Sequence, residues 1–279
     1  MILIADSGST KTDWALIKGD KTKIYNTIGL NPFFKSSKEI KKEIKKLVDQ
    51  FNFEKIEEVY FYGAGCSSEK NNKIVQKALN KSFPNATINV DHDLLGAARA
   101  SCGKEKGICA ILGTGSNSCL YDGEKIIDNK KALGFILGDE GSGAFMGKQL
   151  VQDFLNKELP KSVEYKFVEF SEYNKDEILR KVYSEELPNR FLASFAKLII
   201  ENKEIFYFKS LINESFNKFF NKHLCKYENY KSYKLNTVGS IAYLNKNELK
   251  KSCTLKGMEL GLVIQKPIEG LIKFHSNEQ

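Results

Sequence analysis

The sequence predicts an α/β protein built from two related lobes. Strand and helix patterns alternate along the first half of the 279-residue chain, which is typical of an α/β domain. A strand–turn–strand unit with a small polar turn occurs in "DSGSTKTDWALIKGD" (6–20) and again in "GTGSNSCLYDG" (113–123). We therefore expect a first lobe over 1–106 and a second lobe with a helical insertion over 107–262. A helix over about 263–279 is expected to pack back on the first lobe.

Each element of the first lobe has its own pattern. Alternating apolar residues and glycine exits indicate strands, and an apolar stripe at Ile40, Ile44 and Leu47 indicates a helix with lysines on its solvated face. The expected strands cover 2–5, 12–17, 23–29, 57–65 and 86–91, and the expected helices cover 37–51, 69–81 and 93–101.

The second lobe is predicted in less detail. The strand–turn–strand unit at the start of the chain is repeated here, with a strand over Ile108 to Leu112, a polar turn over 113–117 and a return strand over 118–121. Residues 141–231 are mostly helical in pattern, and "YKLNTVGSIAYL" indicates a strand ending at Gly239. The tail "VIQKPIEGLIKFH" (263–275) indicates a closing helix.

Composition excludes several classes of function. The net charge of +8 suggests nucleic acid, but the lysines belong to solvated helix faces and no basic–aromatic segment is present, so we expect no nucleic-acid partner. Six scattered cysteines and three histidines show no metal-ligand spacing, and reduced thiols are expected. No apolar run reaches the length of a membrane span, and no basic segment precedes the first strand. We therefore expect a cytoplasmic protein without a membrane partner.

The polar turn "DSGSTKT" is not a standard nucleotide loop. A P-loop needs glycine directly before its lysine, where this chain has Thr10. The pattern G-x-G-x-x-G also fails because Gly8 stands alone. Turn chemistry by itself accounts for such residues, since Ser, Gly and Asp favour turns.

Four motifs in order nevertheless carry a resemblance to a known family. They are "DSGSTKT", "GTGSN", "GDEGSG" and "VGSIAY". With them, the chain resembles the actin/hexokinase/Hsp70 ATPase superfamily and, within it, the BadF/BadG/BcrA/BcrD group that includes the N-acetylglucosamine kinases. The resemblance implies a two-lobed, ribonuclease H-like fold that closes over ATP, with the two hairpin turns at its phosphates.

The resemblance also implies which residues bind the nucleotide and its metal. Small residues let backbone N–H groups approach phosphates. The implied nucleotide-binding residues are Gly8, Ser9, Thr10, Lys11, Gly113, Thr114, Gly115, Ser116, Gly239 and Ser240. Asp6, at a strand end, is implied to hold Mg²⁺ through water, since Mg²⁺ takes few carboxylates.

On the sugar side, the resemblance implies that Asp93, in "DLLG", is the catalytic carboxylate. Asn31, Gly134 and Asp139 are the other implied substrate-binding residues, and Glu140 is a lesser candidate. Local structure offers alternatives: helix capping for Asp93 and Asp139, and an Asn-Pro turn for Asn31. Two departures from the family pattern are Ser7, where a second glycine is common, and Leu133, where animal sugar kinases have an aromatic residue.

The function implied is an ATP-dependent amino-sugar kinase, with N-acetylglucosamine as substrate, its 6-hydroxyl as acceptor and Asp93 as general base. Glucosamine and N-acetylmuramic acid are alternatives. A dehydratase activator with a shared iron–sulfur cluster is another, but "ATINVDHDLLGA" lacks the thiolates that a cluster needs. A nucleotide-binding regulator is a third, and a homodimer is compatible with the resemblance.

Overall fold

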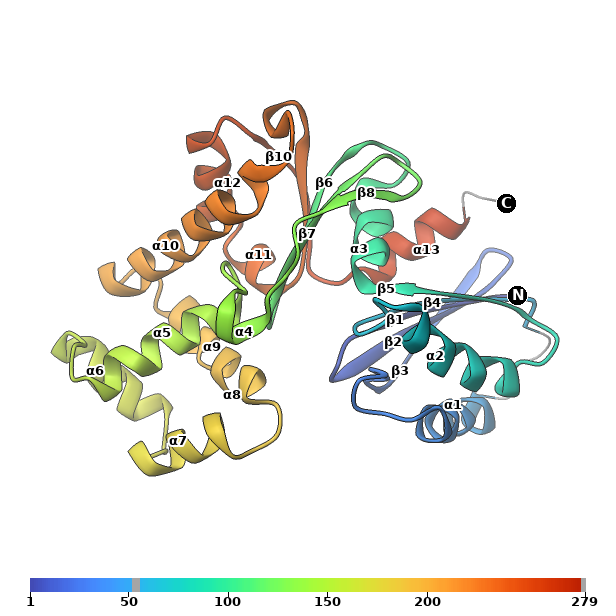
Figure 1. The fold of residues 1–279 in the computed structure, drawn as a ribbon, viewed down its shortest axis with the longest axis horizontal. Coiled ribbons are helices and arrows are strands. Elements are labelled where there is room, and N and C mark those ends of the chain that lie inside the picture. The colour runs from blue at the N-terminus through green and yellow to red at the C-terminus, as the bar shows by residue number, and fades with distance from the viewer. Residues whose placement is uncertain (52–55, 277–279) are drawn as a thin grey trace. The chain divides into compact units, whose positions relative to one another are not determined.

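A computed structural model describes residues 1–51 and 56–276 of the chain. The chain folds into two compact units (Figure 1): residues 1–104 with the segment from Pro267 onward, and residues 105–266. Each unit contains one five-stranded sheet, with strand orders β3-β2-β1-β4-β5 and β10-β9-β6-β7-β8. No helix in the described ranges combines the length and the apolar character that crossing a membrane requires.

The first unit has the strands and helices that the sequence predicts. Strand β1 pairs antiparallel with β2 and parallel with β4. The strands are β1 Ile2–Ser7, β2 Lys11–Lys18, β3 Lys21–Ile28, β4 Glu58–Gly63 and β5 Thr87–His92. The helices are α1 Ser37–Phe51, α2 Glu69–Ser82, α3 Asp93–Cys102 and α13 Ile268–Ser276.

Helices cover both faces of this sheet (Figure 1). On one face, α1 and α2 bury apolar residues against Leu3, Trp14 and Phe61. On the other face, α3 packs closely on β4, because a side-chain Cβ at Gly96 would lie 2.7 Å from Cβ of Tyr62. Gly96 therefore sets how near the beginning of α3 lies to the sheet.

The C-terminal helix is joined to β4 and α3 by a buried polar contact. Arg99 Nη1 donates to the Tyr62 hydroxyl oxygen over 2.7 Å, and the same hydroxyl shares a 2.9 Å hydrogen bond with His275 Nε2. Burial, with a smaller contribution from the charge of Arg99, lowers the pKa of His275 to about 4. His275 is therefore neutral in the folded protein near pH 7.

This burial predicts a pH-dependent stability. An unfolded histidine has a pKa near 6.5, so between pH 6.5 and about 4 the unfolded chain binds more protons than the folded one. We expect the free energy of unfolding to fall by about 2 kcal/mol from pH 7 to pH 5 through this residue. Urea unfolding of the wild type and of His275→Gln at both pH values measures it, because the variant should lose less stability. Equal losses in the two proteins would contradict it.

The second unit contains a longer series of helices around its sheet. Its strands are β6 Gly107–Leu112, β7 Ser116–Tyr121, β8 Ile126–Asn129, β9 Lys234–Val238 and β10 Glu259–Ile264. Its helices are α4 Gly134–Leu137, α5 Gly143–Leu155, α6 Lys161–Phe170, α7 Lys175–Tyr183, α8 Pro188–Ser194, α9 Ala196–Glu201, α10 Phe206–Lys222, α11 Ser240–Leu244 and α12 Lys246–Leu255. Two short 3-10 turns, Leu224–Lys226 and Tyr230–Ser232, follow α10.

Three features of this unit differ from the sequence prediction. Strands β8 and β10 are additional, and β7 begins at Ser116 because Ser116 pairs with Leu112 across a shorter turn. The prediction of a closing helix over 263–275 is wrong about where that helix begins. Val263 and Ile264 pair with β9 as the end of β10, and the helix begins only at Ile268, after Pro267.

Candidate active site

The turn between β1 and β2 is closed by its own backbone and by hydroxyl groups. Gly8 N donates to Lys11 O over 2.9 Å, which leaves the side chains of Ser9 and Thr10 exposed at the tip. The Ser7 and Thr12 hydroxyls share a 2.8 Å hydrogen bond, and Leu30 N donates to Ser7 Oγ over 3.1 Å. Ser7 thus serves a purpose that a glycine could not, since it joins the turn to the segment after β3.

Asn31 lies beside this turn. Its Nδ2 donates to Ser9 Oγ over 2.8 Å, and its Oδ1 accepts from Phe33 N over 2.9 Å. A Cβ at Gly65 would lie 2.2 Å from Asn31 Oδ1, so the loop after β4 needs a glycine there, with a φ of +84°. The structure therefore brings together the turn tip, Asn31 and the loop after β4. The glycines of "YGAG" were the only sequence signal for that loop.

Asp6 and Asp93 form a pair of neighbouring carboxylates in the first unit. Burial, with smaller contributions from the negative charges of Asp93 and Asp13, raises the pKa of Asp6 to about 7. Burial also raises the pKa of Asp93, against the opposing effect of His92. Two carboxylates of such different position, one at the end of a strand and one at the beginning of a helix, are suited to different roles.

The beginning of α3 corrects one alternative for Asp93. The residue that caps the helix is His92, whose Nδ1 accepts from Leu95 N over 3.3 Å, while Asp93 is the first helical residue. The role of N-cap residue therefore does not explain why position 93 is an aspartate. Asp91 differs in its surroundings: burial raises its pKa, and the charge of Arg99 opposes that rise.

Asp13 is committed to structural contacts. Its Oδ1 lies 2.7 Å from Lys11 Nζ and also accepts from Asn26 Nδ2. The described residues contain no cluster of three or more His, Cys, Asp or Glu side chains suited to a metal ion. Mg²⁺ is usually held by one or two carboxylates with water and substrate phosphates, and Asp6 is the carboxylate of this unit that could hold it.

The turn between β6 and β7 is attached to the beginning of α5. Gly143 N donates to Gly113 O over 2.8 Å, and Ala144 N donates to Thr114 O over 3.0 Å. A Cβ at Gly239, which has a φ of +122°, would lie 2.3 Å from Leu112 O. The end of β9 therefore reaches the end of β6 only because residue 239 is glycine.

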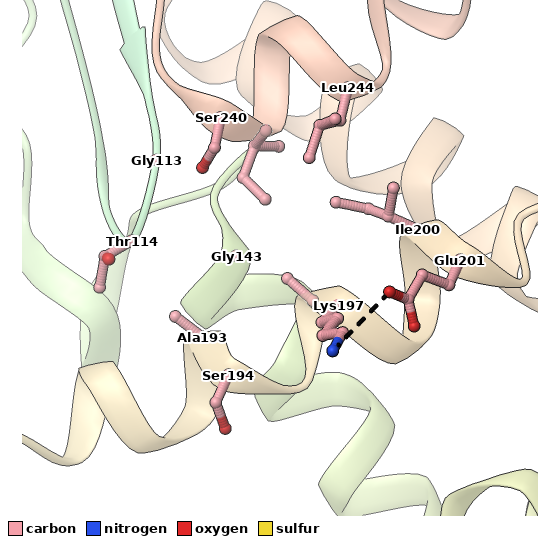
Figure 2. Close-up of a pocket in the computed structure, with 12 residues that line it drawn as sticks. Gly113, Thr114, Gly143, Ala193, Ser194, Lys197, Ile200, Glu201, Ser240 and Leu244 are labelled. Atoms are coloured by element: carbon pink, nitrogen blue, oxygen red, sulfur yellow. Dashed lines mark ion pairs between the residues drawn. The ribbon is translucent and has the colours of Figure 1, made fainter. Parts of the chain in front are cut away.

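These segments line a pocket of about 430 Å³ (Figure 2). Gly113 and Thr114 contribute from the turn, and Ser240 from the beginning of α11. Ile241 and Leu244 of α11 line the same side as Ser240. The other wall comes from α8 and α9, with the small and apolar side chains of Ala193, Ala196 and Ile200 and the ion pair of Lys197 and Glu201. The volume falls within the range of small-molecule sites and fits a nucleoside. Sequence reasoning missed the walls from α8 and α9, because their helical pattern carries no motif.

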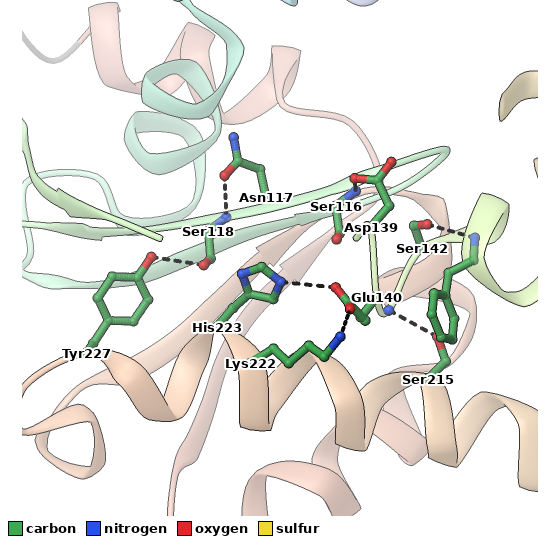
Figure 3. A network of polar contacts seen from close by, with 12 residues as sticks. Ser116, Asn117, Ser118, Asp139, Glu140, Ser142, Ser215, Lys222, His223 and Tyr227 are labelled. Atoms are coloured by element: carbon green, nitrogen blue, oxygen red, sulfur yellow. Dashed lines mark hydrogen bonds and ion pairs between the residues drawn. The ribbon is translucent and has the colours of Figure 1, made fainter. Parts of the chain in front are cut away.

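Asp139 and Glu140 lie at the loop before α5 (Figure 3). Asp139 Oδ1 accepts from Ser116 N over 3.3 Å, and burial raises the pKa of Asp139. Burial opposes ionisation of Glu140, but hydrogen bonds from Lys222 and His223 to its carboxylate hold its pKa below the usual value. The Asp139 carboxylate therefore lies beside the turn between β6 and β7.

Gly134 begins the short helix α4 with a φ of +75° and open space where a side chain would lie. Lys148 of α5 donates to Phe135 O over 2.7 Å and holds α4 against α5. The adjacent side chains Leu133, Ile136 and Leu137 are exposed. No hydrogen bond in the described part of the chain joins the Gly134 backbone to Asp139.

The chain matches the model of the BadF/BadG/BcrA/BcrD ATPase family over residues 5–204. A Porphyromonas gingivalis structure named "putative N-acetylglucosamine kinase" is 40% identical, with a TM-score of 0.94 and coverage of 99% of both chains. A Chromobacterium violaceum structure of the same name is 13% identical, with a TM-score of 0.76 and coverage of 98% of both chains.

A more distant structure shares the fold. It is a ROK-family glucokinase from Streptomyces griseus with glucose and AMPPNP, 12% identical, with a TM-score of 0.53 and coverage of 99% of this chain and 98% of that one. No curated protein matches the chain.

Proposed function

Because the chain belongs to the BadF/BadG/BcrA/BcrD ATPase family and has the two-lobed α/β fold of actin-like ATPases, we propose that it is an ATP-dependent kinase of an amino sugar. N-acetylglucosamine is the proposed substrate, and its 6-hydroxyl is the proposed acceptor. The 40% identity to the Porphyromonas gingivalis protein, which is named as an N-acetylglucosamine kinase, supports this choice of sugar.

The observation that carries the proposal is the neighbouring pair Asp6 and Asp93. A kinase of this kind needs one carboxylate for the metal and another for the acceptor hydroxyl. Asp6 is the last but one residue of β1, close to the proposed phosphate-binding turn, and Asp93 begins α3, whose packing is set by Gly96 against Tyr62. After burial, the negative charge of Asp93 is the next cause of the raised pKa of Asp6, which supports placing the two carboxylates near each other.

The other candidate residues then take consistent roles. Asp93 orients the sugar hydroxyl and accepts its proton, while Asn31, Gly134 and Asp139 bind the sugar. Backbone N–H groups and hydroxyls of residues 8–11 and 113–116 bind the phosphates, and Gly239 and Ser240 bind the nucleoside in the pocket of Figure 2. Mg²⁺ held through Asp6 would neutralise charge that develops on the transferred phosphoryl group.

We also propose that the protein acts in the cytoplasm as a homodimer. All six cysteines are free, which suits a reducing compartment. Sedimentation equilibrium measures the oligomeric state, and a monomer at micromolar concentration would contradict the dimer.

An ADP-release screen tests the proposed function. The sugars are N-acetylglucosamine, glucosamine, N-acetylmuramic acid, N-acetylmannosamine and glucose, each with ATP and Mg²⁺. We expect the greatest stimulation from N-acetylglucosamine, with a phosphorylated product identified by mass spectrometry. Stronger stimulation by another amino sugar would change the substrate. ATP hydrolysis that no sugar stimulates would contradict a kinase and favour an ATPase activator or a regulator.

A further inference from the structure

We propose that Glu140, held by Lys222 and His223, is a positioning residue that fixes Asp139 for substrate binding. This inference rests on the proposed function and adds to it the side-chain contacts that hold one proposed sugar-binding residue in place. Neither Lys222 nor His223 belongs to any of the motifs that the sequence displays.

Glu140 is a buried carboxylate with a partner at each oxygen (Figure 3). Only 3% of the residue is exposed. Lys222 Nζ lies 2.5 Å from Oε1, and His223 Nε2 lies 3.2 Å from Oε2. A buried carboxylate without partners is strongly unfavourable, so these two contacts determine where the Glu140 side chain lies.

The next residue is attached to the same helix. Gly141 N donates to Ser215 Oγ over 3.0 Å, and a Cβ at Gly141 would lie 3.0 Å from Cβ of Phe219. Positions 215, 219 and 222 recur at the spacing of one helix face, with His223 directly after α10. The loop thus lies along one face of α10 and is attached to it at consecutive residues.

Asp139 needs such support because its backbone is strained. Its φ of +57° lies in the left-handed region, which is unfavourable for a residue other than glycine. The conformation directs its carboxylate to Ser116 N, at the turn between β6 and β7. If Glu140 were released from α10, Asp139 could relax to an ordinary conformation, and its carboxylate would leave this position.

The main test is steady-state kinetics of Glu140→Ala with N-acetylglucosamine and ATP. We expect the sugar KM to rise by about tenfold to hundredfold, since a displacement of about 1 Å in a positioning contact has effects of that size. The KM for ATP should change less than about twofold, because the pocket for the nucleoside is made by other residues. Glu140→Gln keeps the shape but only one of the two acceptor oxygens, so it should recover only part of the loss.

Lys222 offers a milder variant that keeps the fold, because its side chain is 60% exposed. Lys222→Met should raise the sugar KM and Lys222→Arg should restore it. Lys218→Met is the matched control: Lys218 lies on the same helix and pairs with Glu214 over 2.7 Å, away from Glu140. It should leave both KM values unchanged.

Hydrogen exchange provides a readout that does not need turnover. The amides of residues 139–142 should exchange at least about tenfold faster in Glu140→Ala than in the wild type, while those of β6 stay protected. Unchanged exchange, or an unchanged sugar KM in a folded Glu140→Ala protein, would overturn the positioning role alone. A wild type that phosphorylates no sugar would overturn the proposed function, and the positioning role with it.

Discussion

Replacing Asp93 with asparagine is expected to slow sugar phosphorylation by about 10²–10⁴-fold, the usual contribution of general-base catalysis. A protonated hydroxyl is a poor nucleophile, and a carboxylate within hydrogen-bonding distance both orients it and takes its proton. Asparagine keeps the size of the side chain but cannot accept that proton. The measurement is the sugar-dependent rate of ADP release at saturating ATP.

The structure indicates that this variant should fold. The cap of α3 is His92, whose contact with Leu95 N does not involve residue 93. Asp91→Asn is the matched control, because Asp91 lies near Arg99 and is not among the proposed site residues; its activity should stay near the wild-type level. If Asp91→Asn is inactive and Asp93→Asn is active, the wrong carboxylate has been assigned.

Asp6→Asn is expected to lower the rate of Mg²⁺-dependent turnover by about 10³-fold or more, since a metal ion contributes several kcal/mol to stabilising charge in such reactions. Titration of ADP release with Mg²⁺ at fixed ATP and sugar measures the effect. Retention of wild-type Mg²⁺ dependence in the variant would show that Asp6 does not hold the metal.

Loss of activity in this variant should not come with loss of stability. Burial, together with the repulsion of Asp93 and Asp13, raises the pKa of Asp6 to about 7, so the ionised group is unfavourable in the folded protein. Its neutral replacement should therefore unfold at an equal or higher urea concentration near pH 8. Asp20→Ala, at the exposed turn between β2 and β3, is the control and should keep full activity.

Much of the first unit is determined by the sequence itself. The strand–turn–strand opening, the third strand, the helix over 37–51 and the helix beginning at Asp93 are all present as predicted. These elements depend on local information: residue alternation, an apolar stripe at helical spacing, and turn residues. Four motifs in order also indicated the family, which the family model confirms over residues 5–204.

Tertiary structure decided the features that depend on residues far apart in the chain. Strand β10 is short, and only its pairing with β9 makes Val263 and Ile264 a strand end rather than a helix beginning. The hydrogen bond from Leu30 N accounts for a serine at position 7, and the contacts with Lys222 and His223 account for a glutamate at position 140. These partners lie far apart in the chain, so no local sequence pattern indicates them. The pocket proposed for the nucleoside likewise takes a wall from α8 and α9. The physical reason is the same in each case: side-chain contacts across a fold depend on packing, while turns and helices depend on neighbours in the chain.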